Sequence, residues 1–204
     1  MPGAAQTQVR VASVGAPRST PEFEALEVMN GLLGGLFTSR INLNLREDKG
    51  YTYGAFSTFA FRHDAGPFYV GAGVRSDATA PSVTEIYNEI KKMKDVQVTM
   101  EELSLGKDSL VRSMPGRFET TAQAAASFAN LFIYDLGLDY YSKYIERVGN
   151  IDAAAVQAAA RKHLVPEKML VVAVGDRQKI EADLAKLNLG AAELRDAEGN
   201  VVKQ

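Results

Sequence analysis

The spacing of apolar residues in the first part of the chain predicts one strand followed by two helices. Apolar and polar positions alternate over residues 8–14, which is the period of a half-buried strand. A helix is expected next, because apolar residues then recur three or four positions apart: Phe23, Leu26, Met29 and Leu33. The pair Gly34-Gly35 ends this helix, and a second helix follows with the stripe Phe37, Ile41 and Leu45.

From Tyr51 the period of the pattern changes to two. Alternate residues then share one face of a long predicted strand: Tyr53, Ala55, Ser57, Phe59 and Phe61. Residues 64–67, Asp-Ala-Gly-Pro, have the composition of a turn, and residues 68–75 predict the partner strand. The two strands are therefore expected to form a hairpin.

The second half of the chain is predominantly helical. Thr99 and Glu102 have the spacing of a capping box at the start of one helix. Further helices are expected over about residues 120–134 and 152–164. The continuous apolar run over residues 168–174 predicts a last strand at an interior position of the sheet.

Together these elements predict an α+β fold, in which a two-layer arrangement places a mixed β-sheet against a backing of helices. Residues 1–204 are expected to form a single domain, with residues 188–204 as a loosely held polar tail. The start Met1-Pro2-Gly3 is compatible with a cut point inside a longer protein.

The composition excludes several kinds of catalytic site and partner, because the residues that they require are absent. The 204 residues include no cysteine, which excludes thiol catalysis, disulfides and cysteine-ligated zinc. The formal net charge of −2 provides no electrostatic footprint for nucleic acid, and no apolar run approaches the roughly 20 residues of a membrane span. We therefore expect neither a nucleic-acid partner nor membrane insertion. The compartment stays open: cytoplasmic, or periplasmic or secreted if a signal precedes the chain.

The two histidines are not expected to form a metal site. His63 and His163 are a hundred positions apart, and neither has the second histidine and the glutamate at helical spacing that a zinc protease needs. No metal and no cofactor are therefore expected in this chain.

Residues 45–54, Leu-Arg-Glu-Asp-Lys-Gly-Tyr-Thr-Tyr-Gly, join the end of a predicted helix to the start of a predicted strand. Arg46 offers a planar cation and Tyr53, seven positions later, a phenolic donor; the two suit a carbonyl group on which negative charge develops. The alternative from the residues alone is that Arg46 complements the helix dipole, paired with Glu47 or Asp48, and that Tyr53 is a half-buried strand residue.

Residues 37–54 read F-T-S-R-I-N-L-N-L-R-E-D-K-G-Y-T-Y-G and closely resemble the C-terminal domain of the pitrilysin (insulinase) and mitochondrial-processing-peptidase family of zinc peptidases. Further matching segments follow one another in the order of the family: Gly15-Ala16-Pro17 with Pro21, Gly34-Gly35, Gly66-Pro67 and Pro115-Gly116-Arg117-Phe118-Glu119. The resemblance therefore covers most of the chain. It implies the α+β fold of the metallohydrolase domain of mitochondrial-processing-peptidase-like proteins.

The resemblance implies an unequal division of roles. In this family an N-terminal domain carries zinc on the inverted motif H-x-x-E-H with a downstream glutamate, and a similarly folded C-terminal domain lacks the metal. This chain resembles the second domain, so zinc is expected in a partner domain and the chain alone is expected to be inactive. Arg46 and Tyr53 match the family residues that hold the substrate backbone and the polarised scissile carbonyl. Their expected roles are supporting ones, and neither is a nucleophile or a base.

The expected partners are a zinc-bearing peptidase domain or subunit and an extended peptide substrate, and a homo-oligomer is compatible with the sequence. Two alternatives stay open. One is a structural scaffold, the role of some family members in respiratory complexes. The other is a module that adds an extended peptide to a sheet edge without proteolysis. The substrate preference and the location of the zinc domain, in the same polypeptide or in another subunit, also stay open.

Overall fold

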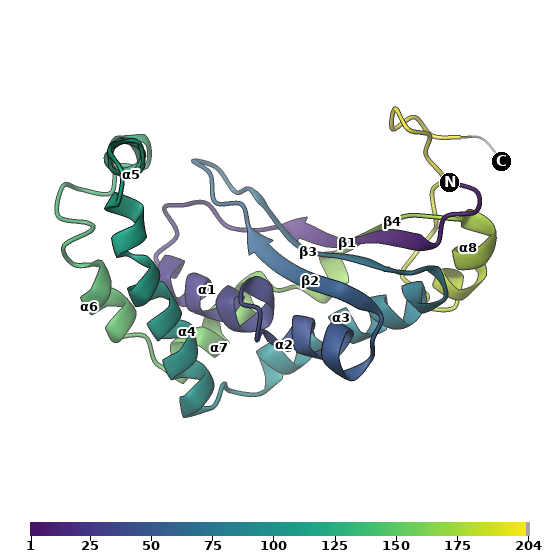
Figure 1. The fold of residues 1–204 in the computed structure, drawn as a ribbon, viewed down its shortest axis with the longest axis horizontal. Helices are drawn as coiled ribbons and strands as arrows, with labels where there is room; N and C mark the ends of the chain where they lie inside the picture. Colours follow the sequence, from purple (N-terminus) through teal and green to yellow (C-terminus); the bar gives the residue numbers. More distant parts are fainter. Residues whose placement is uncertain (203–204) are drawn as a thin grey trace.

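One sheet of four strands forms a layer of the protein, in the order β2-β3-β1-β4 (Figure 1). The computed structural model describes residues 1–202. Within them the strands are β1 (Gln6–Val14), β2 (Thr52–Phe59), β3 (Pro67–Arg75) and β4 (Leu170–Val174). Residues 203 and 204 of the expected tail lie outside the described residues.

The sheet is antiparallel in all of its described pairings, where a mixed sheet was expected. β2 and β3 form the expected hairpin, and β1 lies between β3 and β4 and runs opposite to both. Parallel pairs require crossover connections that bring a strand back in the same direction, and none of these three pairings has that geometry. The α+β class, with helices backing the sheet, is confirmed.

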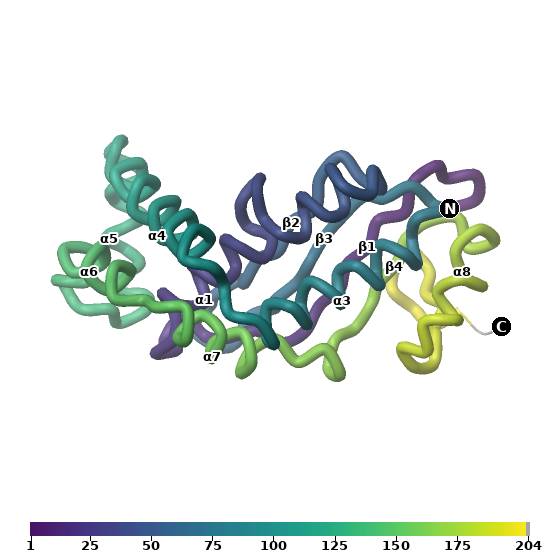
Figure 2. The backbone as a smooth tube through the Cα atoms, turned by 90° about the horizontal axis from the view of Figure 1, so that it is seen from below, coloured from purple at the N-terminus to yellow at the C-terminus, as the bar shows by residue number. Residues whose placement is uncertain are grey.

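Helices cover one face of the sheet and extend past one of its ends (Figures 1 and 2). The helices along the sheet are α1 (Phe23–Asn30), α2 (Arg40–Asn42), α3 (Thr79–Asp95) and α7 (Ala153–His163). A helical extension at one end consists of α4 (Met100–Ser113), α5 (Thr121–Ile133) and α6 (Tyr144–Gly149). At the opposite end, α8 (Arg177–Ala185) lies near the N-terminus (Figure 1).

Short helical turns join or prolong these elements. Two are π-helical: η1 (Gly31–Gly35) continues α1, and η2 (Leu43–Asp48) continues α2. Three are 3₁₀ turns: η3 (Ser76–Ala78), η4 (Pro115–Phe118) and η5 (Pro166–Lys168). Leu36, directly after η1, has an extended backbone, so the helix stops after Gly34-Gly35 as its sequence predicts.

The hydrophobic core lies between the sheet and its helices. Strands and helices both contribute side chains with no exposed surface: Val9, Val11, Phe68, Val70, Leu26, Met29, Ile86 and Ile90. On β4, in contrast, Leu170 is 66% and Val174 is 49% exposed. β4 pairs with β1 on one side and forms an edge of the described sheet, so the interior position predicted from its apolar run is wrong.

The other edge strand, β2, is covered by side chains from the helices. The backbone N–H of Ala55 donates to Oδ1 of Asn42 over 2.9 Å, and Nδ2 of Asn30 donates to the carbonyl oxygen of Ser57 over 3.2 Å. Gly34 approaches the same strand so closely that a Cβ atom on it would lie 2.5 Å from the backbone nitrogen of Ser57. Covering an edge in this way blocks the addition of another strand.

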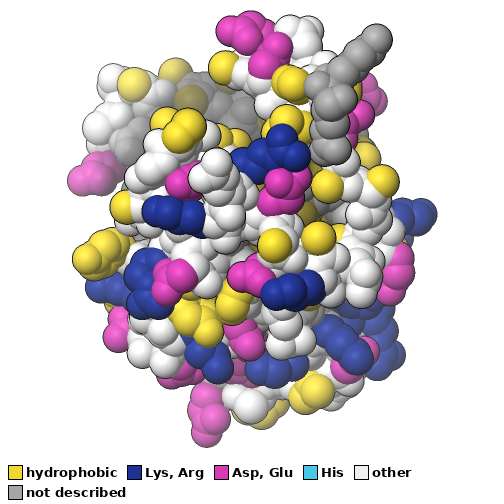
Figure 3. Space-filling model, turned by 90° about the vertical axis from the view of Figure 1, so that its right-hand side faces the viewer, with side chains coloured by type: hydrophobic (Ala, Val, Ile, Leu, Met, Phe, Trp, Pro, Cys, Tyr) yellow, Lys and Arg dark blue, Asp and Glu magenta, His cyan; other side chains and the backbone are white. Residues whose placement is uncertain are grey.

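The charged surface is mixed where it can be seen at the α8 end of the molecule. Lys and Arg side chains alternate there with Asp and Glu side chains, without a large field of one sign (Figure 3). Nucleic-acid surfaces typically gather basic side chains into one patch, which this face does not do. No helix within residues 1–202 is long and apolar enough to cross a membrane.

Candidate functional site

Arg46 lies on the π-helical turn η2, just before the chain enters β2. Leu45 is fully buried and fixes the turn against the core. Gly50 then adopts a positive φ of 62°, a conformation that costs glycine little, and the backbone N–H of Tyr51 donates to the carbonyl oxygen of Leu45 over 2.8 Å. The helix therefore ends within four residues of Arg46, which brings the start of β2 next to it.

The guanidinium group of Arg46 rests on an aromatic ring. Its Cζ atom lies 4.6 Å from the centre of the Phe37 ring, a favourable arrangement for a cation. Its Nε atom lies 3.3 Å from Oε1 of Glu47, so the acidic neighbour does pair with it. The side chain keeps 35% of its surface exposed. Arg46 is therefore oriented by contacts on one side and still accessible from the other.

Tyr53 lies on a β-bulge at the start of β2. The regular register of the β2–β3 pair is broken between Thr52 and Ala55, and Oγ1 of Thr52 donates to the carbonyl oxygen of Gly73 over 2.7 Å and accepts from the N–H of Gly54 over 3.1 Å. Tyr53 is 89% exposed, whereas Ala55 is buried. The bulge therefore separates Tyr53 from the buried face that simple alternation predicts for it.

The structure brings Arg46 and Tyr53 to the same end of β2 without joining them. No hydrogen bond links the two side chains, and the phenol of Tyr53 has no hydrogen-bond partner within residues 1–202. Tyr51 differs from Tyr53 in being half-buried and packed against the core. An exposed and unpartnered aromatic side chain contributes little to folding, so Tyr53 is available to an external group.

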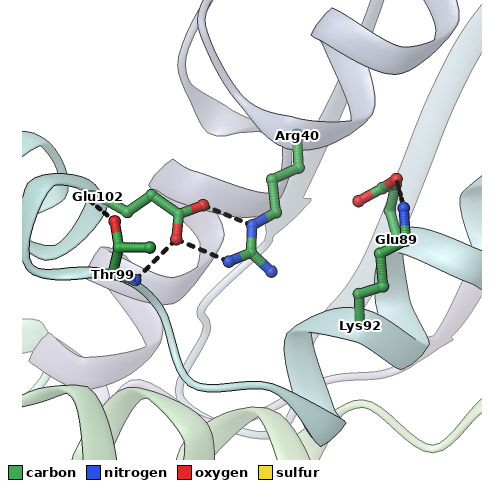
Figure 4. A network of polar contacts seen from close by, with 5 residues as sticks. All are labelled: Arg40, Glu89, Lys92, Thr99 and Glu102. Atoms are coloured by element: carbon green, nitrogen blue, oxygen red, sulfur yellow. Dashed lines mark hydrogen bonds and ion pairs between the residues drawn. The ribbon is translucent and has the colours of Figure 1, made fainter.

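A polar network that the sequence does not predict fixes α2, the helix that precedes Arg46 in the chain. Arg40, at the start of α2, donates two hydrogen bonds to Glu102 over 2.7 and 2.8 Å (Figure 4). Glu102 also accepts from the backbone N–H of Thr99 over 2.9 Å, as the predicted capping box requires. The hydrogen bonds from Arg40 are the main reason that the pKa of Glu102 lies below its usual value.

A second contact fixes η2 itself to α3. Nδ2 of Asn44 donates to Glu89 over 2.8 Å and to Glu85 over 3.0 Å. Glu89 is only 5% exposed and also accepts from Lys92 over 2.7 Å (Figure 4). The carboxylate of Glu89 raises the pKa of Lys92, which stays charged. The π-helical turn that carries Arg46 is thus fixed to α3, and Arg40 fixes the preceding helix α2 to α4.

Neither histidine lies at this site. The side chain of His63 is 86% exposed at the hairpin turn. His163, on α7, is mostly buried, and this burial lowers its pKa although Glu22 lies 3.7 Å from its Nε2 atom. Within residues 1–202, no group of three or more histidine, aspartate or glutamate side chains is arranged to hold a metal ion.

Comparison with known proteins identifies this fold as an inactive domain of the peptidase M16 type. Residues 1–110 match the family described as the peptidase M16 inactive domain, and the chain belongs to this family. The chain is also 28% identical over 96 residues to the uncharacterized zinc protease YmxG of Bacillus subtilis, a match that covers 47% of this chain and 24% of that protein.

Solved structures share the fold. A crystal structure of a peptidase M16 inactive domain from Pseudomonas fluorescens has a TM-score of 0.79 and 26% identity, over 85% of this chain and 41% of that chain. A protease from Helicobacter pylori has a TM-score of 0.77 and 19% identity, over 86% of this chain and 42% of that chain, which shows the fold alone. This chain spans less than half the length of each of these relatives.

Proposed function

We propose that this chain is the non-catalytic domain of a zinc-dependent metalloendopeptidase that binds the substrate and supports the transition state. The zinc site belongs to another domain of the same polypeptide or to a partner subunit. One observation carries this proposal: Tyr53 is 89% exposed on a β-bulge, its phenol has no hydrogen-bond partner within residues 1–202, and the turn that presents Arg46 directly precedes this strand. A phenol exposed in this way contributes little to folding, and together with the accessible side of the Arg46 guanidinium group it suits an external carbonyl group.

The role of Tyr53 follows from the chemistry of peptide hydrolysis on zinc. Attack on the scissile carbonyl produces a tetrahedral oxyanion, and a zinc ion in the partner domain would supply the activated water and polarise the carbonyl. A phenol O–H that reaches this oxygen strengthens its hydrogen bond as the charge develops. The proposal assigns that hydrogen bond to Tyr53, which therefore stabilises the transition state more than the bound substrate.

Arg46 is proposed to hold the substrate backbone. A guanidinium group is planar, always charged and forked, so it can bind the main-chain carbonyl oxygens of an extended peptide with two N–H donors. Phe37 and Glu47 hold one side of the Arg46 side chain and leave its other side free. An extended peptide would then lie across Arg46 toward Tyr53.

Replacing Arg46 by lysine is expected to restore little of the activity lost in Arg46→Ala, although lysine keeps the charge. Hydrogen bonds to charged groups contribute about 1.5–3 kcal/mol, so Arg46→Ala should lower kcat/KM of the assembled protease about 10- to 100-fold. Lysine is a point charge and cannot reproduce the fork. Steady-state cleavage of a quenched fluorescent peptide measures both variants, and full activity of Arg46→Lys would contradict the bidentate role.

The alternative that a peptide adds to a sheet edge is disfavoured at β2. The side chains of Asn42 and Asn30 already occupy backbone groups on the outer edge of that strand. A peptide that paired with β2 would have to displace both asparagines and the π-helical turn η1. The proposed binding of substrate therefore uses the side chains of Arg46 and Tyr53 rather than this strand edge.

The purified chain is expected neither to bind zinc stoichiometrically nor to cleave peptides. Its donors can orient a substrate, but they supply neither a nucleophile nor a base. Metal analysis after dialysis against zinc, together with the peptide-cleavage assay, tests this expectation. Cleavage by the purified chain that a chelator abolishes would overturn the division of roles. Adding the zinc-bearing H-x-x-E-H domain or subunit should produce activity.

A further inference from the structure

Asn42 joins the two segments that present the site. It lies on α2 and is only 3% exposed. Its Nδ2 atom donates to the carbonyl oxygen of Phe37 over 2.7 Å, and its Oδ1 atom accepts from the backbone N–H of Ala55 over 2.9 Å. Phe37 is the residue whose ring contacts the guanidinium group of Arg46. Ala55 is the residue at which the regular β2–β3 register resumes after the bulge that exposes Tyr53.

The pairing requires one donor and one acceptor on the same short side chain. Asparagine has both, whereas aspartate has only acceptors when ionised and leucine has neither. The hydrogen bond to Ala55 is buried, where water does not readily replace it, and the hydrogen bond to the carbonyl oxygen of Phe37 is partly buried. Neither aspartate nor leucine can therefore make both of the hydrogen bonds that Asn42 makes.

We propose that Asn42 is a positioning residue, which fixes the Phe37 support of Arg46 relative to the bulge that carries Tyr53. This inference rests on the proposed function, in which Arg46 and Tyr53 bind the same peptide substrate. A single amide ties both segments, so neither can shift without straining the other. Catalytic groups must be held to within about 0.5 Å, and a misplacement of about 1 Å can cost 100-fold in rate.

The chain contains a matched control for this role. Asn30 also ties a helix to β2, since its Nδ2 atom donates to the carbonyl oxygen of Ser57 over 3.2 Å and its Oδ1 atom accepts from Oγ of Ser57 over 2.8 Å. Ser57 lies farther along β2, beyond the bulge. Asn30→Leu should therefore loosen β2 at Ser57 without changing the Ala55 amide or the relation between Arg46 and Tyr53.

The test combines NMR on the 204-residue chain with kinetics on the assembled protease. In Asn42→Leu the Ala55 amide should exchange with solvent at least about 10-fold faster, and the signals of the Phe37 ring and the Arg46 Nε–H group should shift. Asn42→Asp keeps the acceptor, so it should retain the protection of the Ala55 amide and shift only the Phe37 and Arg46 signals. Asn30→Leu should leave all of these signals as in the wild type.

In the protease, both Asn42 variants should lower kcat about 10- to 100-fold on a quenched fluorescent peptide, and Asn30→Leu should stay within about twofold. Wild-type signals for Ala55, Phe37 and Arg46 in a folded Asn42→Asp chain would overturn the inference, whatever the activity. Shifted signals with unchanged kcat would also overturn it, provided that Arg46→Ala and Tyr53→Phe are impaired. If those two variants are fully active, the proposed function itself is wrong.

Discussion

Replacing Tyr53 by phenylalanine is expected to lower kcat of the assembled protease about 100- to 1,000-fold, because loss of one oxyanion donor has this effect in comparable sites. The change removes one oxygen atom from a side chain that is 89% exposed, so the fold should not change. KM should change little, since the hydrogen bond forms mainly in the transition state. Single-turnover cleavage of a quenched peptide measures the chemical step directly.

Tyr51 provides the control for this prediction. It is two residues away, half-buried and packed against the core, and its ring would be kept in Tyr51→Phe. The Tyr51→Phe protease should therefore have nearly wild-type kcat. A Tyr53→Phe protease that is as active as Tyr51→Phe would show that the exposed phenol does not act on the reacting carbonyl.

Replacing Gly34 by alanine is expected to destabilise the chain by about 3 kcal/mol, at the upper end of the usual cost of overpacking. A Cβ atom at this position would lie 2.5 Å from both the backbone nitrogen and Oγ of Ser57 and 2.7 Å from its Cβ atom. Backbone atoms cannot rotate away, so η1 or β2 would have to shift. Thermal unfolding followed by circular dichroism should show a Tm lower by roughly 6–12 °C for a chain of this size.

Gly31 lies in the same π-helical turn and tests whether the effect is steric. The nearest atom to a Cβ there would be Cγ of Leu36 at 3.9 Å, an ordinary contact. Alanine also has a higher helix propensity than glycine. Gly31→Ala should therefore leave the Tm unchanged or raise it. Equal destabilisation by both substitutions would contradict the close approach of Gly34 to β2.

Local features of this fold could be predicted from the sequence because their causes are local. The capping box of Thr99 and Glu102 depends on groups three residues apart and is present as predicted. Asp152 likewise caps α7, where its side chain accepts from the N–H of Ala155 over 2.7 Å. The β2–β3 hairpin follows from the turn composition and the alternation on either side of it.

Features that depend on distant segments could not be predicted in this way. The apolar run of β4 has the same composition at an edge as at an interior position, and only its pairing with β1 decides between them. The bulge before Ala55 moves Tyr53 out of the expected alternation without any change in the apolar pattern. Glu102 binds Arg40, 62 positions earlier in the chain, in addition to its capping role.

The candidate site also combines features that the sequence predicts with features that it does not. The spacing of Arg46 and Tyr53 is visible in the sequence, and the family resemblance assigns the pair its roles. The sequence does not show that Phe37 supports the guanidinium group or that Asn42 ties Phe37 to β2. These contacts depend on how the packing of α2 places Phe37 and the buried Asn42 side chain against η2 and β2, so only the folded structure identifies them.

The most direct test of the central claim is kcat/KM for peptide cleavage by the protease assembled from this chain and its zinc-bearing counterpart. Four versions of the chain are compared: wild type, Arg46→Ala, Tyr53→Phe and Tyr51→Phe. Our account predicts losses of at least about 10-fold for Arg46→Ala and 100-fold for Tyr53→Phe, with Tyr51→Phe within about twofold of wild type. Equal activity of all four versions would contradict the claim that this metal-free domain acts on the bound substrate through Arg46 and Tyr53.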